Sequence, residues 1–232
     1  EQDSRYFADF AQVPCLEPSD QQECYTFTRE AFELSETLRV PVLLRLVTRL
    51  AHSRAQVTPA PPRPQNEARY VADASLYTLI PSNARRAYGK LLDKQAALAD
   101  WSEAHPANAL TLRDRRGPGI LVSGIAWNYL REALGPALAR YHVLRIGAYP
   151  LPLKKVRALL DASTEVWVIE EGDPFIERYV SALGLLREPP IKGRMTGYLP
   201  RPGELLPALP GRALGIPGRA ALHAAGLEVV LV

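Results

Sequence analysis

Residues 119–134, GILVSGIAWNYLREAL, carry the clearest signal for the fold class of this chain. The stretch opens with a short apolar run that favours a strand, turns at Ser123 and Gly124, and continues with the spacing of an amphipathic helix over residues 125–138. The same order recurs twice, with strands over 143–146 and 166–169 and helices over 153–161 and 173–186. Asp173 and Pro174 are typical of a helix start. Strands that alternate with helices predict an α/β fold with a Rossmann-like parallel sheet.

The first third of the chain predicts a second, smaller α/β unit. We expect a helix over 6–11, an extended segment over 13–16, and a long helix that starts at a capping box. In that box, Gln22 and Glu23 lie three residues after Ser19 and Asp20. The helix carries an apolar stripe at Cys24, Phe27, Ala31, Leu34 and Leu38. Residues 42–48 then form a run typical of a strand buried on both faces of a parallel sheet. These elements amount to half of a doubly wound domain.

Four regions follow from this pattern. Residues 1–56 form the first unit, 57–116 a linker with a bridging helix, 117–188 the second unit, and 189–232 a tail rich in proline and glycine. The linker begins with a proline-dense, extended connector over 58–64. Its helix, over 83–103, is apolar on the side of Tyr88, Leu91, Gln95, Leu98 and Trp101. We expect the tail to be extended, with one short strand at 227–232.

Composition excludes several classes of protein. The net charge is only +3 and the basic residues are scattered without interleaved aromatics, so we expect no nucleic-acid binding. No apolar run approaches the ~20 residues that span a bilayer, so we expect a cytoplasmic protein with no membrane segment. The two cysteines, Cys15 and Cys24, fit no zinc or iron–sulfur spacing and are predicted to be free, buried or half-buried thiols. We assign no metal ligand and no catalytic residue.

Ligands of an open parallel sheet bind beyond the carboxyl ends of its strands. In the second unit these ends are at 123–124, 147–148 and 170–172. Backbone amides at 123–124 can bind an anion at a helix start, but a glycine in such a turn is common and we favour a structural role. Glu170 and Glu171 point to opposite sides of a strand and form no acid/base dyad. Their carboxylates can accept hydrogen bonds from a ribose or form salt bridges to another subunit, and we favour the salt bridges.

Basic residues follow the strand of the first unit, at Arg45, Arg49, His52 and Arg54. Arginine binds a carboxylate through two parallel hydrogen bonds, so this segment suits an acidic ligand. An ordinary solvated loop explains the same residues equally well.

Several stretches, in order along residues 1–205, resemble the large (alpha) subunit of indolepyruvate:ferredoxin oxidoreductase, a thiamine-diphosphate-dependent 2-oxoacid:ferredoxin oxidoreductase. EQDSRY (1–6), LEPSD (16–20), AFELSE (31–36), PVLLR (41–45) and TRLAHSR (48–54) resemble the end of its pyrimidine-binding domain. IPSNARR (80–86) is similar to the family's interdomain helix. VSGIAWNYLREAL (122–134), GAYPLP (147–152) and VIEEGDP (168–174) resemble its transketolase-C-terminal-like domain, and LPRPGEL (199–205) the linker after it.

The resemblance implies both a fold and an activity. The fold is the C-terminal half of a thiamine pyrimidine-binding domain followed by a transketolase-C-terminal-like domain. The activity is oxidative decarboxylation of aryl-2-oxoacids such as indolepyruvate to acyl-CoA, with ferredoxin as electron acceptor. It implies thiamine diphosphate with magnesium and 4Fe-4S clusters as cofactors. It also implies a small beta subunit and ferredoxin as partners, and coenzyme A and an aryl-2-oxoacid as substrates.

The family's chemical motifs have no counterpart in this chain, so the resemblance implies a fragment that is inactive alone and binds no cofactor tightly. The activating glutamate is expected before Glu1, and the magnesium–diphosphate motif and cysteine clusters after about residue 206, where the pattern departs from the family. By position, Glu1, Gln2 and Arg5 are the residues expected nearest the thiamine. Arg49 and His52 are the next candidates.

Two other interpretations stay open. One is a non-catalytic, Rossmann-like binding or assembly module. The other, a free-standing nucleotide-binding protein, is weakened by the missing Gly-x-Gly-x-x-Gly motif. Because half a doubly wound domain exposes an apolar sheet edge, we expect residues 1–56 alone to be unstable or to aggregate.

Overall fold

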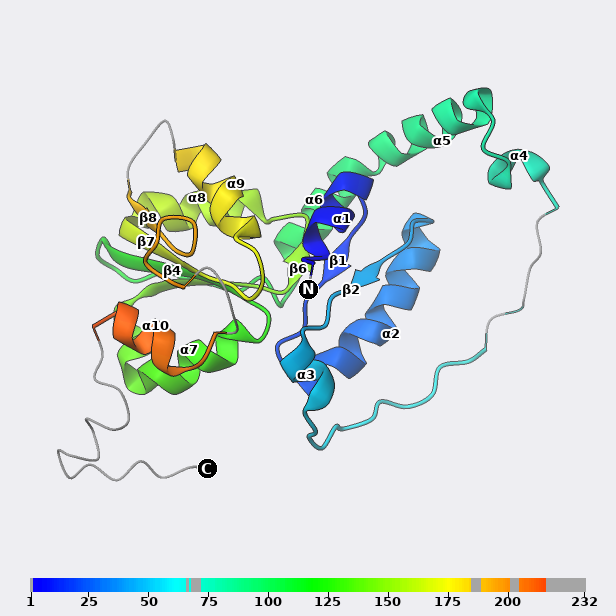
Figure 1. The fold of residues 1–232 in the computed structure, drawn as a ribbon. Coiled ribbons are helices and arrows are strands. Elements are labelled where there is room, and N and C mark those ends of the chain that lie inside the picture. Colours follow the sequence, from blue (N-terminus) through cyan, green and yellow to red (C-terminus); the bar gives the residue numbers. More distant parts are fainter. Residues whose placement is uncertain (1, 66, 68–71, 185–188, 201–204, 216–232) are drawn as a thin grey trace.

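The computed structural model describes residues 2–65, 67, 72–184, 189–200 and 205–215. Within them the chain forms two sheets side by side, each with its own helices (Figure 1). The possible strand at 227–232 lies outside the described residues.

The larger sheet contains five strands in the order β3-β5-β4-β7-β8. They are β3 (Leu110–Thr111), β4 (Gly117–Ser123), β5 (His142–Ile146), β7 (Ser163–Ile169) and β8 (Ile191–Lys192). All neighbours pair in parallel except β3, which is antiparallel to β5. The central strand β4 carries the apolar run at 120–122, and Ile120 lies between Val143 of β5 and Trp167 of β7. The prediction of three strand–helix units around a parallel sheet is confirmed.

Helices cover both faces of this sheet (Figure 1). On one face lie α7 (Ala126–Leu134), the 3-10 helix Gly135–Arg140 and α10 (Ala208–Ala213), and on the other α8 (Leu153–Ala162) and α9 (Phe175–Gly184). The strands serve both cores because successive side chains point to opposite faces. Leu121 packs with the α8–α9 side, whereas Ile120 and Val122 pack with the α7–α10 side.

The smaller sheet belongs to the start of the chain and has the order β2-β1-β6. Its elements are α1 (Arg5–Ala11), β1 (Cys15–Leu16), α2 (Gln21–Leu38), β2 (Leu43–Leu44) and α3 (Thr48–His52), joined by β6 (Ala148–Tyr149). Strands β1 and β2 are parallel and α2 crosses between them, as predicted. The capping box is confirmed, since Asp20 accepts from the Glu23 amide and the Glu23 carboxylate accepts from the Ser19 amide.

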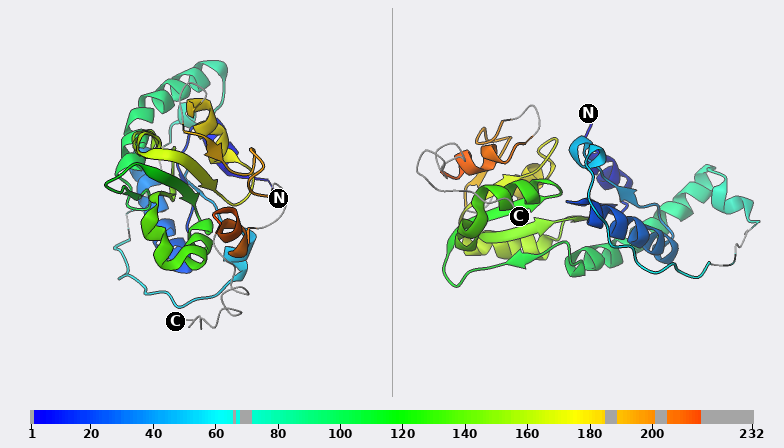
Figure 2. Two further views of the ribbon diagram at one scale, coloured as in Figure 1. Left: turned by 90° about the vertical axis from the view of Figure 1, so that its left-hand side faces the viewer. Right: turned by 90° about the horizontal axis from the view of Figure 1, so that it is seen from below.

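The linker consists of an extended proline-rich segment that contacts α2 and of helices that are packed to different extents against the rest of the chain. The proline-rich segment is extended and runs along α2, where the Thr58 backbone exchanges hydrogen bonds with the Gln22 side chain. After α4 (Ala74–Tyr77), helix α5 (Pro81–Asp93) has no buried residue and projects from the rest of the chain (Figures 1 and 2). Helix α6 (Gln95–Ala104) returns to the smaller sheet through buried Leu98. The predicted single bridging helix is therefore two helices.

Three further predictions need correction. The run 42–48 is a strand over only two half-buried residues, because β2 is an edge strand with β1 as its neighbour and the chain enters α3 at Thr48. The first turn of α9 is capped by Glu170, whose carboxylate accepts from the Ile176 and Glu177 amides, whereas the Asp173 carboxylate accepts from the Tyr6 hydroxyl. The segment after residue 189 is not simply an extended tail, since it supplies β8, α10 and two buried leucines of the α7–α10 core, Leu199 and Leu205.

Candidate functional site

The first part of the chain covers the carboxyl ends of the strands in the larger sheet, where ligands of such sheets usually bind. At the end of β4, the space beside Gly124 is filled by Glu17, whose carboxylate oxygen lies 2.5 Å from the position of an added Cβ. After β5 the chain crosses into the smaller sheet as β6. At the end of β7, Glu170 meets Arg5. The Glu17 carboxylate also accepts from the Ser123 hydroxyl at 3.4 Å, and the Gly124 amide donates to the Ile146 carbonyl at 3.3 Å, so the space considered for an anion beside this turn is filled by the chain itself.

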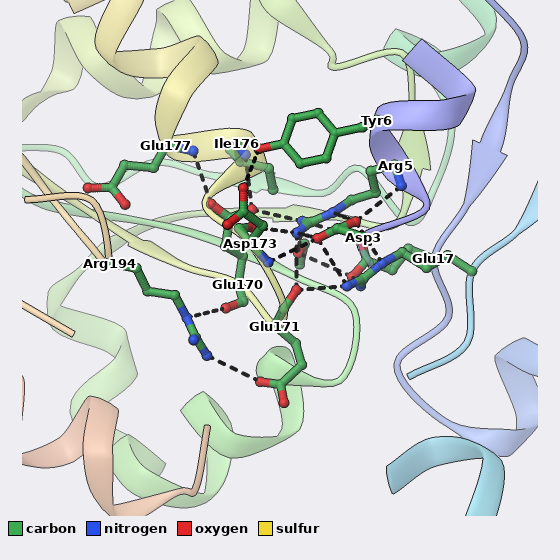
Figure 3. A network of polar contacts seen from close by, with 12 residues as sticks. Asp3, Arg5, Tyr6, Glu17, Glu170, Glu171, Asp173, Ile176, Glu177 and Arg194 are labelled. Carbon is green, nitrogen blue, oxygen red and sulfur yellow. Dashed lines mark hydrogen bonds and ion pairs between the residues drawn. The ribbon is translucent and has the colours of Figure 1, made fainter. Parts of the chain in front are cut away.

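A group of buried charged side chains holds the two parts together at this edge (Figure 3). We call it the buried ion cluster, and it consists of Asp3, Arg5, Glu17, Arg45 and Glu170. Arg5 donates from Nη1 to Glu170 Oε2 at 2.8 Å and from Nε to Asp3 Oδ1 at 2.9 Å. Arg45 pairs with Asp3, at 3.2 Å from Nε to Oδ1, and with Glu17. Each of these side chains is at most 6% exposed, so the loss of one partner leaves an uncompensated charge away from water.

The same arginines bind the backbone between β7 and α9. Arg5 Nη2 donates to the carbonyl oxygens of Glu171 and Asp173, at 3.0 Å each, and Arg45 Nη2 donates to the Glu171 carbonyl at 2.8 Å. The Asp173 amide donates in turn to Asp3 Oδ2 at 3.2 Å. Residues 171–173 are thus fixed to the start of the chain by bonds in both directions.

Burial and pairing shift the acidities of this cluster in opposite directions. Burial raises the pKa of Glu170 above its ordinary value of 4.5, although the charge of Arg5 opposes this. Burial also acts to raise the pKa of Asp3, but the hydrogen bond and charge of Arg5 and the charge of Arg45 outweigh it and hold that pKa below 3.8. Burial and the neighbouring Glu17 raise the pKa of Tyr149 well above its usual range, so this phenol keeps its proton and donates it in a hydrogen bond to Glu17.

A cavity of about 820 Å³ opens beside the cluster. It has three walls, formed by residues 2–4, by residues 45–49 and 52–53 at α3, and by residues 171–173 together with Arg194. Thr48, Arg49 and His52 are exposed on α3, whereas Arg45 and Arg194 are buried. The cavity thus combines guanidinium groups and an imidazole with the carboxylates of Asp3, Glu171 and Asp173.

The structure brings together four of the residues proposed from the sequence. Gln2, Arg45, Arg49 and His52 all line this cavity, although Gln2 comes from the start of the chain, Arg45 directly follows β2, and the other two lie on α3. Arg5 does not line it, because its guanidinium is fully buried in the ion cluster. Glu1 lies outside the described residues, and Arg54 follows α3 without lining the cavity.

Sequence reasoning missed Asp3, Glu17 and Arg194. Burial of a charged side chain has no signature in local spacing, because the groups that compensate it lie elsewhere in the chain. The contact of Glu171 with another subunit stays a prediction; within the chain its carboxylate accepts from the Leu205 amide at 3.1 Å and pairs with Arg194 at 3.7 Å.

The resemblance implies magnesium and 4Fe-4S clusters, which need carboxylate, imidazole or thiolate ligands grouped in space. Among the residues that the structure describes, no group of three or more His, Cys, Asp or Glu side chains is placed to hold a metal ion. Cys15 is fully buried and Cys24 half-buried, both are free thiols as predicted, and two cysteines cannot supply the four thiolates of a 4Fe-4S cluster. The described His, Cys, Asp and Glu side chains therefore do not fit a magnesium ion or a 4Fe-4S cluster, and we propose no chemistry on either of them in this chain. Within the described ranges no helix is long and apolar enough to cross a membrane.

Comparison with solved structures defines the class of fold. The chain superimposes on 2-oxoglutarate:ferredoxin oxidoreductase from Magnetococcus marinus with a TM-score of 0.60, over 92% of this chain and 45% of that one, at 14% sequence identity. The two-part α/β fold is thus one that occurs within 2-oxoacid:ferredoxin oxidoreductases. No protein-family model matches the chain.

Sequence comparison is more specific. The chain is 38% identical over 207 residues to indolepyruvate oxidoreductase subunit IorA of Methanothermobacter thermautotrophicus, covering 86% of this chain and 33% of the relative. IorA of Methanothermobacter marburgensis is 33% identical over an alignment of 234 residues, which covers 98% of this chain and 38% of the relative. The chain is therefore homologous to part of IorA, as the resemblance predicted, and it spans about a third of the length of these relatives.

Proposed function

We propose that this chain is a working part of an indolepyruvate-type 2-oxoacid:ferredoxin oxidoreductase. The observation that carries the proposal is the 38% identity to one third of IorA, maintained over 86% of this chain. In this proposal residues 1–56 are the C-terminal half of the pyrimidine-binding domain and 117–188 the transketolase-C-terminal-like domain, joined by 57–116. The whole enzyme would convert an aryl-2-oxoacid and coenzyme A to acyl-CoA and pass electrons to ferredoxin.

The cavity is the part of the chain that would face this chemistry. Its exposed Arg49 suits the carboxylate of an oxoacid, since guanidinium binds carboxylate with two parallel hydrogen bonds. Gln2 and His52 add a carboxamide and an imidazole to the same cavity. Thiamine diphosphate, when bound to the whole enzyme, supplies the electron sink for decarboxylation. This chain's own contribution would be to bind and orient the acid.

A chimera tests the proposal. The matching 207 residues of Methanothermobacter thermautotrophicus IorA are replaced by this chain, and the product is made together with its partner subunit. Indolepyruvate-dependent, coenzyme A-dependent reduction of ferredoxin is then measured, with unaltered IorA as the reference. We expect activity within about tenfold of the reference. A chimera that folds and assembles but has no activity would contradict the proposal and favour the non-catalytic module.

A further inference from the structure

The shape of the cavity depends on a residue that does not line it. Two of its walls, residues 2–4 and 171–173, come from segments that are far apart in the sequence, since Asp3 and Asp173 are separated by 170 residues. Neither wall is a helix or a strand at these positions, apart from the turn that leads into α1. Their separation is therefore set by side-chain contacts, not by a backbone ladder.

Arg5 supplies contacts to both walls at once. It binds Asp3 of the first wall through its backbone amide and its guanidinium, at 3.1 and 2.9 Å. It binds the carbonyl oxygens of Glu171 and Asp173 in the other wall, at 3.0 Å each. A further donor reaches Glu170, which caps α9 directly behind that wall. Figure 3 shows this guanidinium between the two segments.

The geometry is specific to arginine. The guanidinium presents five N–H donors in a rigid fork, whereas a lysine ammonium presents three from a single point. The acceptors around Arg5 lie on three sides, on Asp3, on Glu170 and on two backbone carbonyls. A lysine would keep the charge opposite Glu170 but could not reach all of them. The ring of Phe175 lies 5.3 Å from the guanidinium carbon and further fixes its plane by a cation–π contact.

We propose that Arg5 is a positioning residue, which holds the walls at residues 2–4 and 171–173 at the separation that the ligand of the cavity requires. This inference rests on the proposed function for the identity of the ligand, but not for the geometry. It replaces the expectation that Arg5 itself contacts a cofactor. The acid would contact Gln2, Arg49 or His52, and Arg5 would act through Asp3 and the 171–173 backbone.

Hydrogen exchange in the full chain tests the proposal without any ligand. The reporters are the amides of Asp173, Ile176 and Glu177, which donate to Asp3 or Glu170. The variants are Arg5→Met and Arg5→Lys. The matched control is Arg145→Met, because Arg145 also joins the two parts, through Ser19 and Glu23, but does not line the cavity.

We expect Arg5→Lys to speed exchange at the three reporter amides by about tenfold or more, while amides of β4 keep their rates. Arg5→Met should do the same to a greater degree, and Arg145→Met should leave the reporters unchanged. Equal acceleration in β4, or reporter rates in Arg5→Lys that match the wild type, would reduce Arg5 to an ordinary structural residue. If Arg5→Met does not fold, Arg5→Lys decides alone.

Kinetics of the chimera give a second readout that separates this inference from the proposed function. There, Arg5→Lys should raise the KM for indolepyruvate about tenfold with a smaller change in kcat, because the wall that carries Gln2 is displaced relative to Arg49 and His52 on α3. An unchanged KM in an active chimera would overturn the positioning role. An inactive chimera would count against the proposed function, and the exchange rates would still decide the role of Arg5.

Discussion

Replacing Arg45 by methionine should expose how strongly the two parts depend on the buried ion cluster. Arg45 binds Glu17, Asp3 and the Glu171 carbonyl, and its side chain is only 6% exposed. Arg45→Met keeps most of the side-chain volume but removes one of the two positive charges of the cluster. The three buried carboxylates, those of Asp3, Glu17 and Glu170, are then compensated by Arg5 alone. Removing one partner of a buried ion pair costs about 3–5 kcal/mol. With a urea dependence of roughly 3 kcal/mol/M for a chain of this size, the unfolding midpoint should fall by about 1–2 M.

Urea titration followed by far-UV circular dichroism measures this shift. Arg145→Met is the control, because the side chains of the Arg145–Glu23 ion pair are more exposed, at 17% and 19%. Loss of this ion pair should lower the free energy of unfolding by only about 1 kcal/mol. Glu17→Gln, made alone and together with Arg45→Met, completes a double-mutant cycle whose coupling should exceed about 1 kcal/mol. If Arg45→Met costs no more than the control, or if the cycle shows no coupling, the cluster does not hold the two parts together.

Three further predictions concern other features. Iodoacetamide at about pH 8 should label Cys24 but not Cys15 in the native chain. Burial raises the pKa of both thiols, that of Cys15 to about 12, but Cys15 is fully buried whereas Cys24 is only half-buried. Mass spectrometry that finds two labels would contradict this. Gly172→Ala should lower stability by about 1–3 kcal/mol, because φ is +90° and an added Cβ lies 2.7 Å from two side chains of the ion cluster. Gly89 lies within a helix in open space, so Gly89→Ala should instead raise the stability by about 0.5–1 kcal/mol. Thermal melts in which both substitutions shift the melting temperature in the same direction would contradict this pair of predictions. The depressed pKa of Asp3 stabilises the fold above pH 3.8 and this contribution is lost as pH falls through the lower folded value, so Asp3→Asn should flatten the acid limb of stability against pH.

The larger sheet was predictable because its signals are local. The run at 120–122 is apolar on both faces, and residues 125–134 repeat at helical spacing within a single window. In contrast, β3, β6 and β8 are two residues each, too short for any periodicity. Their positions depend on distant neighbours. Strand β6, for example, pairs with β1, although three strands of the larger sheet, β3, β4 and β5, lie between them in the sequence. The segment after residue 189 was predicted to be an extended tail because it is rich in proline and glycine. Local sequence does not show that Leu199 and Leu205 within it are buried by tertiary packing.

Residues that line the cavity could be predicted from the sequence, but the buried ion cluster beside it could not. Gln2, Arg49 and His52 were found from the family resemblance and from position after a strand, and the structure places them in one cavity. The partners of Arg5 could not be found in this way, because Glu170 lies 165 residues away and nothing near either residue indicates a buried pair. Arg5 was thus expected to face a ligand, whereas its donors are occupied by the chain itself.

The kinetic effect of Arg49→Met in the IorA chimera tests most directly whether this cavity binds the acid substrate of an indolepyruvate-type oxidoreductase. Arg54→Met is the control, since Arg54 is exposed, lies just beyond α3 and does not line the cavity. We expect Arg49→Met to lower kcat/KM for indolepyruvate about tenfold to a hundredfold, as for the loss of a charge-assisted hydrogen bond, whereas Arg54→Met should change it less than about twofold. Equal kcat/KM values for the two variants would contradict this expectation.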